Sequence, residues 1–317
     1  MKMFYFATKF TVLLFICAFL ASCQPEEQQF KIEGLEHVFV IGVDGMSPDG
    51  IQNAHTPAID KLWQGGASTF QARGVLPTSS SPNWASMIMG AGPEQHGITS
   101  NDWRKEEHVL PAVTVDETGY FPTIFSIIRK QEPEAEIGAI YHWGGFGRLF
   151  SHDHVNFHIS PDSEEATASE AIQYIQENKP RFCFIHLDHV DGAGHSKGHG
   201  SPEYYRSVEK ADSLIGNIIE TLEAEQLLDN SLILLTADHG GMGTGHGGET
   251  LEEIQIPFIL YGKGVKKGYN ITGPVNTYDN SVTVAFALGL DIPVHWIGRP
   301  VKEAFEGVSQ GGKIKSK

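Results

Sequence analysis

Carboxylate and imidazole side chains recur in three glycine-rich segments of the chain, and their types indicate a metal centre. The candidate ligands in these segments are Asp44, Asp191, His195, Asp238, His239 and His246. Oxygen and nitrogen donors in this mixture suit a divalent cation, with zinc as the leading candidate. Two glycines lie between Asp191 and His195, which predicts a loop that folds both side chains onto one ion.

A serine-rich segment supplies hydroxyl groups that could act as nucleophiles. Ser81 and Pro82 are typical of the residue that caps a helix and of its first helical position, which predicts that Ser80 lies at a helix N-terminus. The backbone N–H groups there favour an anionic ligand. A serine hydroxyl is a weak nucleophile at neutral pH, and coordination to a dication would activate it.

Apolar runs alternate with helical patterns along the chain, and this alternation predicts the elements that carry these groups. Strands are predicted over residues 38–43, 68–76, 137–141, 182–187, 232–237 and 258–261. Helices are predicted from residue 57, over 82–89, 123–130 and 163–178, from 202 to about 226, and over 281–288. We therefore expect an α/β fold, a three-layer sandwich with a mostly parallel central sheet.

The ends of four predicted strands coincide with the chemically active segments. Asp44, the serine-rich segment, Asp188 and Asp238 each follow a predicted strand, directly or within a few residues. Ligands of such sheets bind at the carboxyl ends of the strands. The candidate ligands and hydroxyls are therefore expected to meet along one edge of the sheet.

The N-terminal segment is predicted to be an export signal and not part of the fold. An apolar run over residues 12–21 is too short to span a bilayer, and residues 1–22 have the features of a signal peptide. Residues 20–23 resemble a bacterial lipoprotein signal, which implies lipidation of Cys23 and an exported protein held at the periplasmic or surface side of the cell envelope. The alternative is an ordinary cleaved signal. A tether over residues 23–36 and a single catalytic domain over residues 37–310 would follow.

Composition narrows the classes of partner. The 317 residues include 23 Lys+Arg and 39 Asp+Glu, giving a net charge of -16, which disfavours a nucleic-acid duplex as partner. Of the 3 cysteines, Cys17 would leave with the signal and Cys23 would carry lipid. Cys183, inside an apolar run, is predicted to be an inert core residue. The membrane would be contacted through the lipid anchor only.

Four segments, taken in order, resemble the alkaline phosphatase superfamily and its type I phosphodiesterase/nucleotide pyrophosphatase branch. They are Asp44-Gly45, then Pro77-Thr78-Ser79-Ser80-Ser81-Pro82-Asn83 followed by His96-Gly97, then Asp191-Gly192-Ala193-Gly194-His195, and Asp238-His239-Gly240. The resemblance implies an alkaline phosphatase-like fold with two divalent ions. One ion would take Asp44, Asp238, His239 and the Ser80 oxygen. The other would take Asp191, His195 and His246, with His295 as the alternative third ligand and Asp188 or His189 as competitors.

The same resemblance implies the roles of the remaining groups. Ser80 takes the nucleophile position, with Ser79 and Ser81 as local rivals, and would form a covalent phosphoseryl intermediate. Asn101 would hold a non-bridging phosphoryl oxygen, and His96 would be structural. Branch members that cleave nucleotides carry an aromatic residue where this chain has Ser81. Any stacking platform must lie elsewhere, and the candidates are Trp84, Trp103, Trp143 and Phe146.

The function implied is metal-dependent hydrolysis of a small phosphate ester, with a phosphodiesterase or nucleotide pyrophosphatase as the main hypothesis. The alternatives on the same fold are a phosphomonoesterase, a phosphonate hydrolase or a sulfatase. Sulfatases place an arginine where this chain has Trp84, which weakens that alternative. A non-catalytic binding lipoprotein is a further alternative.

Overall fold

The computed structural model describes residues 30–308. The predicted signal peptide, Cys23 and most of the tether lie outside the described residues. Within residues 30–308, no helix combines the length and apolar character needed to cross a bilayer.

The described chain alternates between strands and helices. The strands are β1 (His37–Val43), β2 (Ala67–Arg73), β3 (Ile137–Tyr141), β4 (Phe157–Ile159), β5 (Phe182–Leu187), β6 (Ser231–Thr236), β7 (Gln255–Gly262) and β8 (Tyr269–Asn270). The α-helices are α1 (Pro48–Asn53), α2 (Pro57–Gly65), α3 (Ser80–Met89), α4 (Pro93–His96), α5 (Ile124–Gln131), α6 (Glu164–Asn178), α7 (His189–Lys197), α8 (Pro202–Ala224), α9 (Leu251–Ile254) and α10 (Asp279–Leu288). Short 3₁₀ turns cover Phe146–Arg148, His152–His154, Leu228–Asn230 and Lys302–Ala304.

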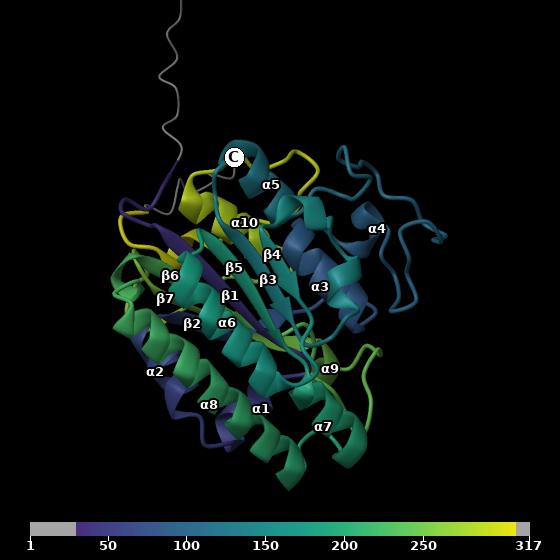
Figure 1. Ribbon diagram of the computed structural model, residues 1–317. Coiled ribbons are helices and arrows are strands. Elements are labelled where there is room, and N and C mark those ends of the chain that lie inside the picture. Colours follow the sequence, from purple (N-terminus) through teal and green to yellow (C-terminus); the bar gives the residue numbers. More distant parts are fainter. Residues whose placement is uncertain (1–29, 309–317) are drawn as a thin grey trace, which may run out of the picture.

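The strands form one 8-stranded sheet in the order β4-β3-β5-β1-β6-β7-β2-β8. Parallel pairing joins β4, β3, β5, β1 and β6, whereas β7 is antiparallel to both β6 and β2. Helices α1, α2, α6, α7 and α8 pack together on one face, and α3, α5 and α10 pack together on the other (Figure 1). The predicted three-layer α/β sandwich with a mostly parallel sheet is confirmed.

Strand β1 lies in the middle of the sheet, between β5 and β6. All of its residues are buried. Its register pairs Val43 with Leu187 of β5 and Gly42 with Thr236 of β6, so the three strands end at the same edge. The loops that follow them therefore start side by side, as the strand-end argument predicted.

Helix α3 approaches the sheet closely through a glycine of β1. A Cβ at Gly42 would lie 2.5 Å from the Trp84 ring, and Trp84 is fully buried. The ring also packs edge-on against Phe146 and Phe184. Residue 42 must therefore lack a side chain for α3 to lie at this height above the strand.

Three details differ from the sequence-based expectations. The segment with Asp191 and His195 is the helix α7 and not a loop, so the loop prediction was wrong. Helix α3 begins at Ser80 with Ser79 as the capping residue, so Ser81 is not the cap. The predicted strand at 258–261 is part of β7, which runs against its neighbours.

Candidate metal centre and nucleophile

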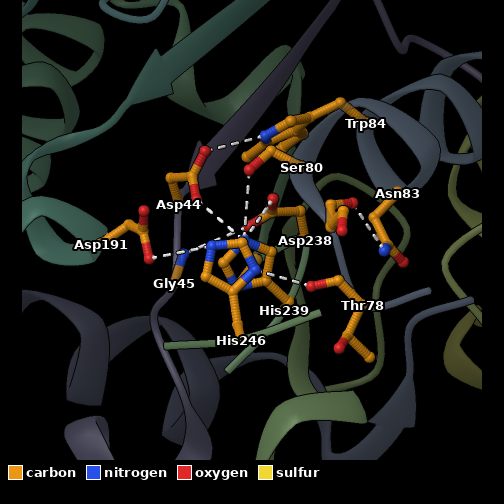
Figure 2. Close-up of polar contacts among 12 residues, drawn as sticks. Asp44, Gly45, Thr78, Ser80, Asn83, Trp84, Asp191, Asp238, His239 and His246 are labelled. Atoms are coloured by element: carbon orange, nitrogen blue, oxygen red, sulfur yellow. Dashed lines mark hydrogen bonds and ion pairs between the residues drawn. The ribbon is translucent and has the colours of Figure 1, made fainter. Parts of the chain in front are cut away.

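Two carboxylates and one imidazole meet where β1 and β6 end. Asp44 follows β1, and Asp238 and His239 follow β6; all three side chains are buried. His239 Nε2 lies 3.3 Å from Asp44 Oδ1 and 3.2 Å from Asp238 Oδ2 (Figure 2). The backbone N–H of Gly45 donates to Asp238 Oδ1 over 3.2 Å, which leaves Oδ2 turned toward the imidazole.

Helix α7 brings a second set of candidate ligands to the same edge. Asp191 and His195 are one helical turn apart, with 3.2 Å between Asp191 Oδ2 and His195 Nε2. His246 Nε2 lies 3.7 Å from Asp191 Oδ1 and 3.1 Å from His195 Nε2. The ring of His246 stacks on that of His239 with 3.6 Å between centroids, so the two ligand sets are contiguous.

The hydrogen bonds of the three imidazoles define which nitrogen is free to bind a metal. His195 Nδ1 contacts the carbonyl of Thr244 at 2.9 Å, and His246 Nδ1 contacts that of Thr78 at 2.8 Å. His239 Nδ1 contacts the carbonyl of Gly240 at 2.8 Å. Because a carbonyl only accepts, each Nδ1 carries the proton and each Nε2 presents a lone pair toward the centre. This anchoring is typical of histidines that ligate metal ions.

Buried oxygen atoms without hydrogen-bond partners show that the donor set fits cations. Asp44 Oδ1, Asp191 Oδ1 and Asp238 Oδ2 are buried and accept no hydrogen bond from the part of the chain that the structure describes. Burial, followed by the neighbouring carboxylates, raises the pKa of all three acids above the ordinary value. A divalent ion would satisfy these oxygens and offset their mutual repulsion, which is the expected behaviour of a metal site.

Burial also lowers the pKa of His239, and the ring is therefore neutral at physiological pH, as a ligand must be.

The alternative ligand His295 is exposed and lies away from the centre. The residue after it, Trp296, packs on Gly90 at the opposite end of α3 from Ser80. The geometry therefore favours His246 over His295.

Ser80 is the hydroxyl that faces the centre. It is the first residue of α3, it is buried, and its Oγ lies 3.3 Å from His239 Nε2. Asn83 holds the preceding loop because its amide donates to the carbonyls of Ser79 and Pro77 over 2.9 and 3.1 Å. The nucleophile candidate is thus fixed by the start of the helix and by a bonded loop.

Asn101 is tied to the start of α3. Its Oδ1 accepts the N–H of Ser81 over 2.8 Å, so only its amide N–H₂ group is free to meet a phosphoryl oxygen. The guanidinium groups of Arg104 and Arg148 both donate to the backbone carbonyl of Asn101, over 3.5 and 3.0 Å. Their proximity lowers the pKa of Arg148, after the larger effect of desolvation. Within residues 30–308, neither arginine forms an ion pair with a carboxylate.

Two residues hold Asp44 in a role that sequence reasoning did not assign to them. Trp84 Nε1 donates to Asp44 Oδ2 over 3.0 Å, and His186 Nε2 lies 3.3 Å from the same oxygen. Asp188, which starts α7, offers an oxygen within 4.8 Å of ligand atoms of Asp44 and His186. His186 is one histidine in an apolar strand, and the only available signal was its place two residues before the strand-end Asp188.

The aromatic candidates for a stacking platform divide by exposure. Trp84 and Phe146 are fully buried, so neither can stack on a substrate base, and that interpretation was wrong for them. Trp143 is half-buried and lies under the Arg148 guanidinium at 5.7 Å, and Trp103 is half-buried beside His108. His96 is buried and bonded to Ser86 Oγ at 3.0 Å, in keeping with a structural role.

The fold, the ligand cluster and the helix-borne hydroxyl define a family, and comparison with known proteins names it. Residues 38–255 match the model of the type I phosphodiesterase / nucleotide pyrophosphatase family. The chain belongs to this family, as the four-segment resemblance predicted.

Curated relatives of the chain are longer proteins. The chain is 24% identical over 221 residues to ectonucleotide pyrophosphatase/phosphodiesterase family member 1 of Homo sapiens, covering 58% of this chain and 21% of the relative. It is 24% identical over 212 residues to bis(5'-adenosyl)-triphosphatase ENPP4 of Homo sapiens, covering 64% of this chain and 47% of the relative. The chain thus spans less than half the length of these relatives.

Solved structures share the fold. An inactive variant of murine ectonucleotide pyrophosphatase/phosphodiesterase 5 in complex with AMP matches with a TM-score of 0.68 and 17% identity, covering 81% of this chain and 96% of that chain. A variant of the alkaline phosphatase PafA matches with a TM-score of 0.71 and 13% identity, covering 85% and 99%. A 2-O GAG sulfatase matches with a TM-score of 0.69 and 16% identity, covering 87% and 75%.

Proposed function

We propose that this protein is a metal-dependent hydrolase of small phosphate esters, and that phosphodiesters or nucleotide pyrophosphates are its substrates. The observation that carries the proposal is the position of Ser80. This residue is the first of α3, and its Oγ lies 3.3 Å from His239 Nε2, beside three carboxylate oxygens that lack hydrogen bonds within residues 30–308. The names of the curated relatives, pyrophosphatase/phosphodiesterase and bis(5'-adenosyl)-triphosphatase, support this substrate class.

Two divalent ions, with zinc as the leading candidate, are the proposed cofactors. Asp44, Asp238, His239 and the Ser80 oxygen would hold one ion, and Asp191, His195 and His246 the other. When bound, the ions would lower the pKa of the serine hydroxyl and of a water molecule and would neutralise charge on the phosphoryl group.

The protein's own groups supply the nucleophile and bind the phosphoryl oxygens. Ser80 Oγ attacks phosphorus in line, and a serine–phosphorus bond forms as the bond to the leaving oxygen breaks. The amide N–H₂ of Asn101 and the N–H of Ser80 hold non-bridging oxygens, because the N–H of Ser81 already donates to Asn101 Oδ1. Water then attacks the phosphorus of this serine ester, which still carries the second organic group of a diester, and returns the free hydroxyl, so the leaving group departs in the first step and a phosphomonoester in the second.

The proposal is tested first by removing the hydroxyl. Ser80→Ala should abolish turnover while the protein still binds the metal ions, because only one ligand oxygen is lost. Ser79→Ala and Ser81→Ala are matched controls from the same loop and should retain turnover. Full activity of Ser80→Ala would exclude Ser80 as nucleophile. Chelation should remove activity and added zinc should restore it; indifference to chelators would exclude the metal centre.

A second candidate function, phosphomonoester hydrolysis, is favoured by Arg104 and Arg148. Two guanidinium groups beside Asn101 without carboxylate partners would suit a phosphoryl group with an additional negative charge. Nitrophenyl esters of phosphodiester, phosphomonoester, phosphonate and sulfate types, each assayed with zinc, separate the candidates. Turnover of none of them would favour a binding protein that has only kept the fold.

We further propose that residues 37–310 act as one catalytic domain carried on a lipid-anchored N-terminus, exported to the cell envelope. The apolar run and Cys23 in the sequence support this location. Metabolic labelling with a fatty acid should label the protein, and Cys23→Ser should abolish both the label and recovery with membranes. Label retained in the Cys23→Ser protein would exclude this anchor.

A further inference from the structure

One buried imidazole near the centre has no hydrogen-bond partner among the described residues 30–308. The His199 side chain is 4% exposed, yet both of its ring nitrogens lack hydrogen bonds. His199 follows α7 by two residues, and its backbone N–H donates to the carbonyl of Gly243 over 2.7 Å. The ring is therefore held in place by the backbone and by packing alone, including the face of Tyr204 at 5.1 Å.

Two glycines make room for this ring. A Cβ at Gly194 of α7, or at Gly241 after β6, would overlap the Nε2 edge of the imidazole. The edge is therefore inserted between the two segments that carry the proposed ligands, since His195 adjoins Gly194 and His239 lies two residues before Gly241. A structural ring would not require its polar edge to face this way.

The polar edge faces an oxygen that also lacks a partner. His199 Nε2 lies 3.9 Å from Asp191 Oδ1, which is buried and accepts no hydrogen bond. This separation is too long for a hydrogen bond. Two ligands of one tetrahedral zinc ion, each about 2.0–2.1 Å from it, lie about 3.3–3.4 Å apart. The pair of unsatisfied atoms would therefore have to close by about 0.5 Å to bind one zinc ion together.

The other donor around Asp191 Oδ1 is consistent with the same arrangement. His246 Nε2 lies 3.7 Å from this oxygen, which is also beyond hydrogen-bond length and only slightly longer than the separation of two ligands on one zinc ion. A cation next to Asp191 Oδ1 would thus be reached by imidazoles from two sides, from the loop after β6 and from the segment after α7.

We propose that His199 is a further ligand of the metal ion held by Asp191, His195 and His246. This inference rests on the proposed two-metal function and adds one residue to its second site. The ion would then have four protein ligands from α7 and the segments after α7 and β6, the same number as the ion at Asp44.

The test measures the binding of zinc or cobalt(II), without any substrate, to the full exported chain. His199→Phe keeps a flat ring between the two glycines but removes the nitrogen, and His199→Gln is the second variant should the larger ring disturb folding. The control is His37→Phe, because His37 is a buried histidine at the opposite end of β1, bonded to the carbonyl of Pro180. Stoichiometry and affinity come from equilibrium dialysis, and ligand number comes from the cobalt(II) absorption spectrum.

We expect the wild-type protein and His37→Phe to bind two ions with the same affinities. His199→Phe and His199→Gln should weaken one of the two ions by at least about tenfold, since even residues that only support ligands contribute that much. The cobalt(II) spectrum of that site should change as well. Two ions bound with unchanged affinity and spectrum in both His199 variants would overturn this inference alone. A wild-type protein that binds no ion would overturn the proposed function together with it.

Discussion

His96 should make the stability of the protein fall in mild acid. Its ring is 2% exposed, its Nδ1 accepts the N–H of Ile98 over 3.1 Å, and its Nε2 contacts Ser86 Oγ at 3.0 Å. Protonation would remove the acceptor for Ile98 and place a charge in the core, and burial lowers the pKa of His96 to about 3. In the unfolded chain the same ring titrates near its ordinary value of about 6.5.

The size of the effect follows from the difference between the two pKa values. Because the folded pKa is depressed, the unfolded chain takes up the proton first, and stability present above pH 6.5 is lost as the pH falls toward 3. A pH of 5.0 is about 1.5 units below the pKa of His96 in the unfolded chain. At about 1.4 kcal/mol per unit, the free energy of unfolding should therefore fall by about 2 kcal/mol. With a urea slope of about 3 kcal/mol per molar, the midpoint should fall by about 0.7 M.

The assay compares urea unfolding of wild type and His96→Gln at pH 7.5 and pH 5.0, followed by circular dichroism with a chelator present. His96→Gln keeps a donor and an acceptor but cannot titrate, so its loss between the two pH values should be about 2 kcal/mol smaller. Its absolute stability does not enter this double difference, and neither do the other buried histidines. Equal losses in the two proteins would refute the reasoning.

The remaining predictions concern the site. Trp84→Phe should weaken zinc binding by about 10–100-fold, because Asp44 Oδ2 loses the donor at 3.0 Å, whereas Phe146→Leu removes ring packing on Trp84 and should leave the zinc affinity unchanged. Equal zinc affinities of the two variants in equilibrium dialysis would contradict this. Arg148→Ala should lower kcat/KM for a nitrophenyl phosphomonoester by about tenfold more than for the diester, since a bond to a charged group contributes about 1.5–3 kcal/mol. Arg206→Ala is the control, because Arg206 forms an exposed ion pair with Glu203 on α8. An equal loss of kcat/KM on both esters in Arg148→Ala would show that Arg148 does not recognise the additional charge of the monoester.

Much of the sheet could be predicted because buried parallel strands are continuous apolar runs. Strands β3 and β5 have the predicted bounds, and β1 begins one residue earlier, at His37. The direction of β7 could not be predicted, since an apolar run does not indicate a strand direction and β7 follows β6 only after a long connection over residues 237–254. Helix α7 was missed because Gly192 and Gly194 disfavour a helix, and packing against α8 overrides that preference.

Within the site, the residues with a local pattern were predictable and the isolated ones were not. Asp44, Asp191 and Asp238 stand next to glycine or histidine near strand ends, and the structure brings them to one edge. His186, inside an apolar strand, and His199, between two glycines, have no neighbour that marks them. Their proximity to Asp44 and Asp191 arises from tertiary packing and is absent from any short window of sequence.

The absence of a side chain at Gly42 determines where Trp84, and with it the start of α3, lies. A methyl group there would have to push the Trp84 ring away by about 1 Å to reach ordinary contact, and Ser80 lies one helical turn from that ring. A misplacement of about 1 Å can change a rate by about 100-fold. Residue 42, which is not among the candidate ligands, is therefore a position at which directed evolution of the proposed activity can shift Ser80, and its partner at residue 84 would have to change with it.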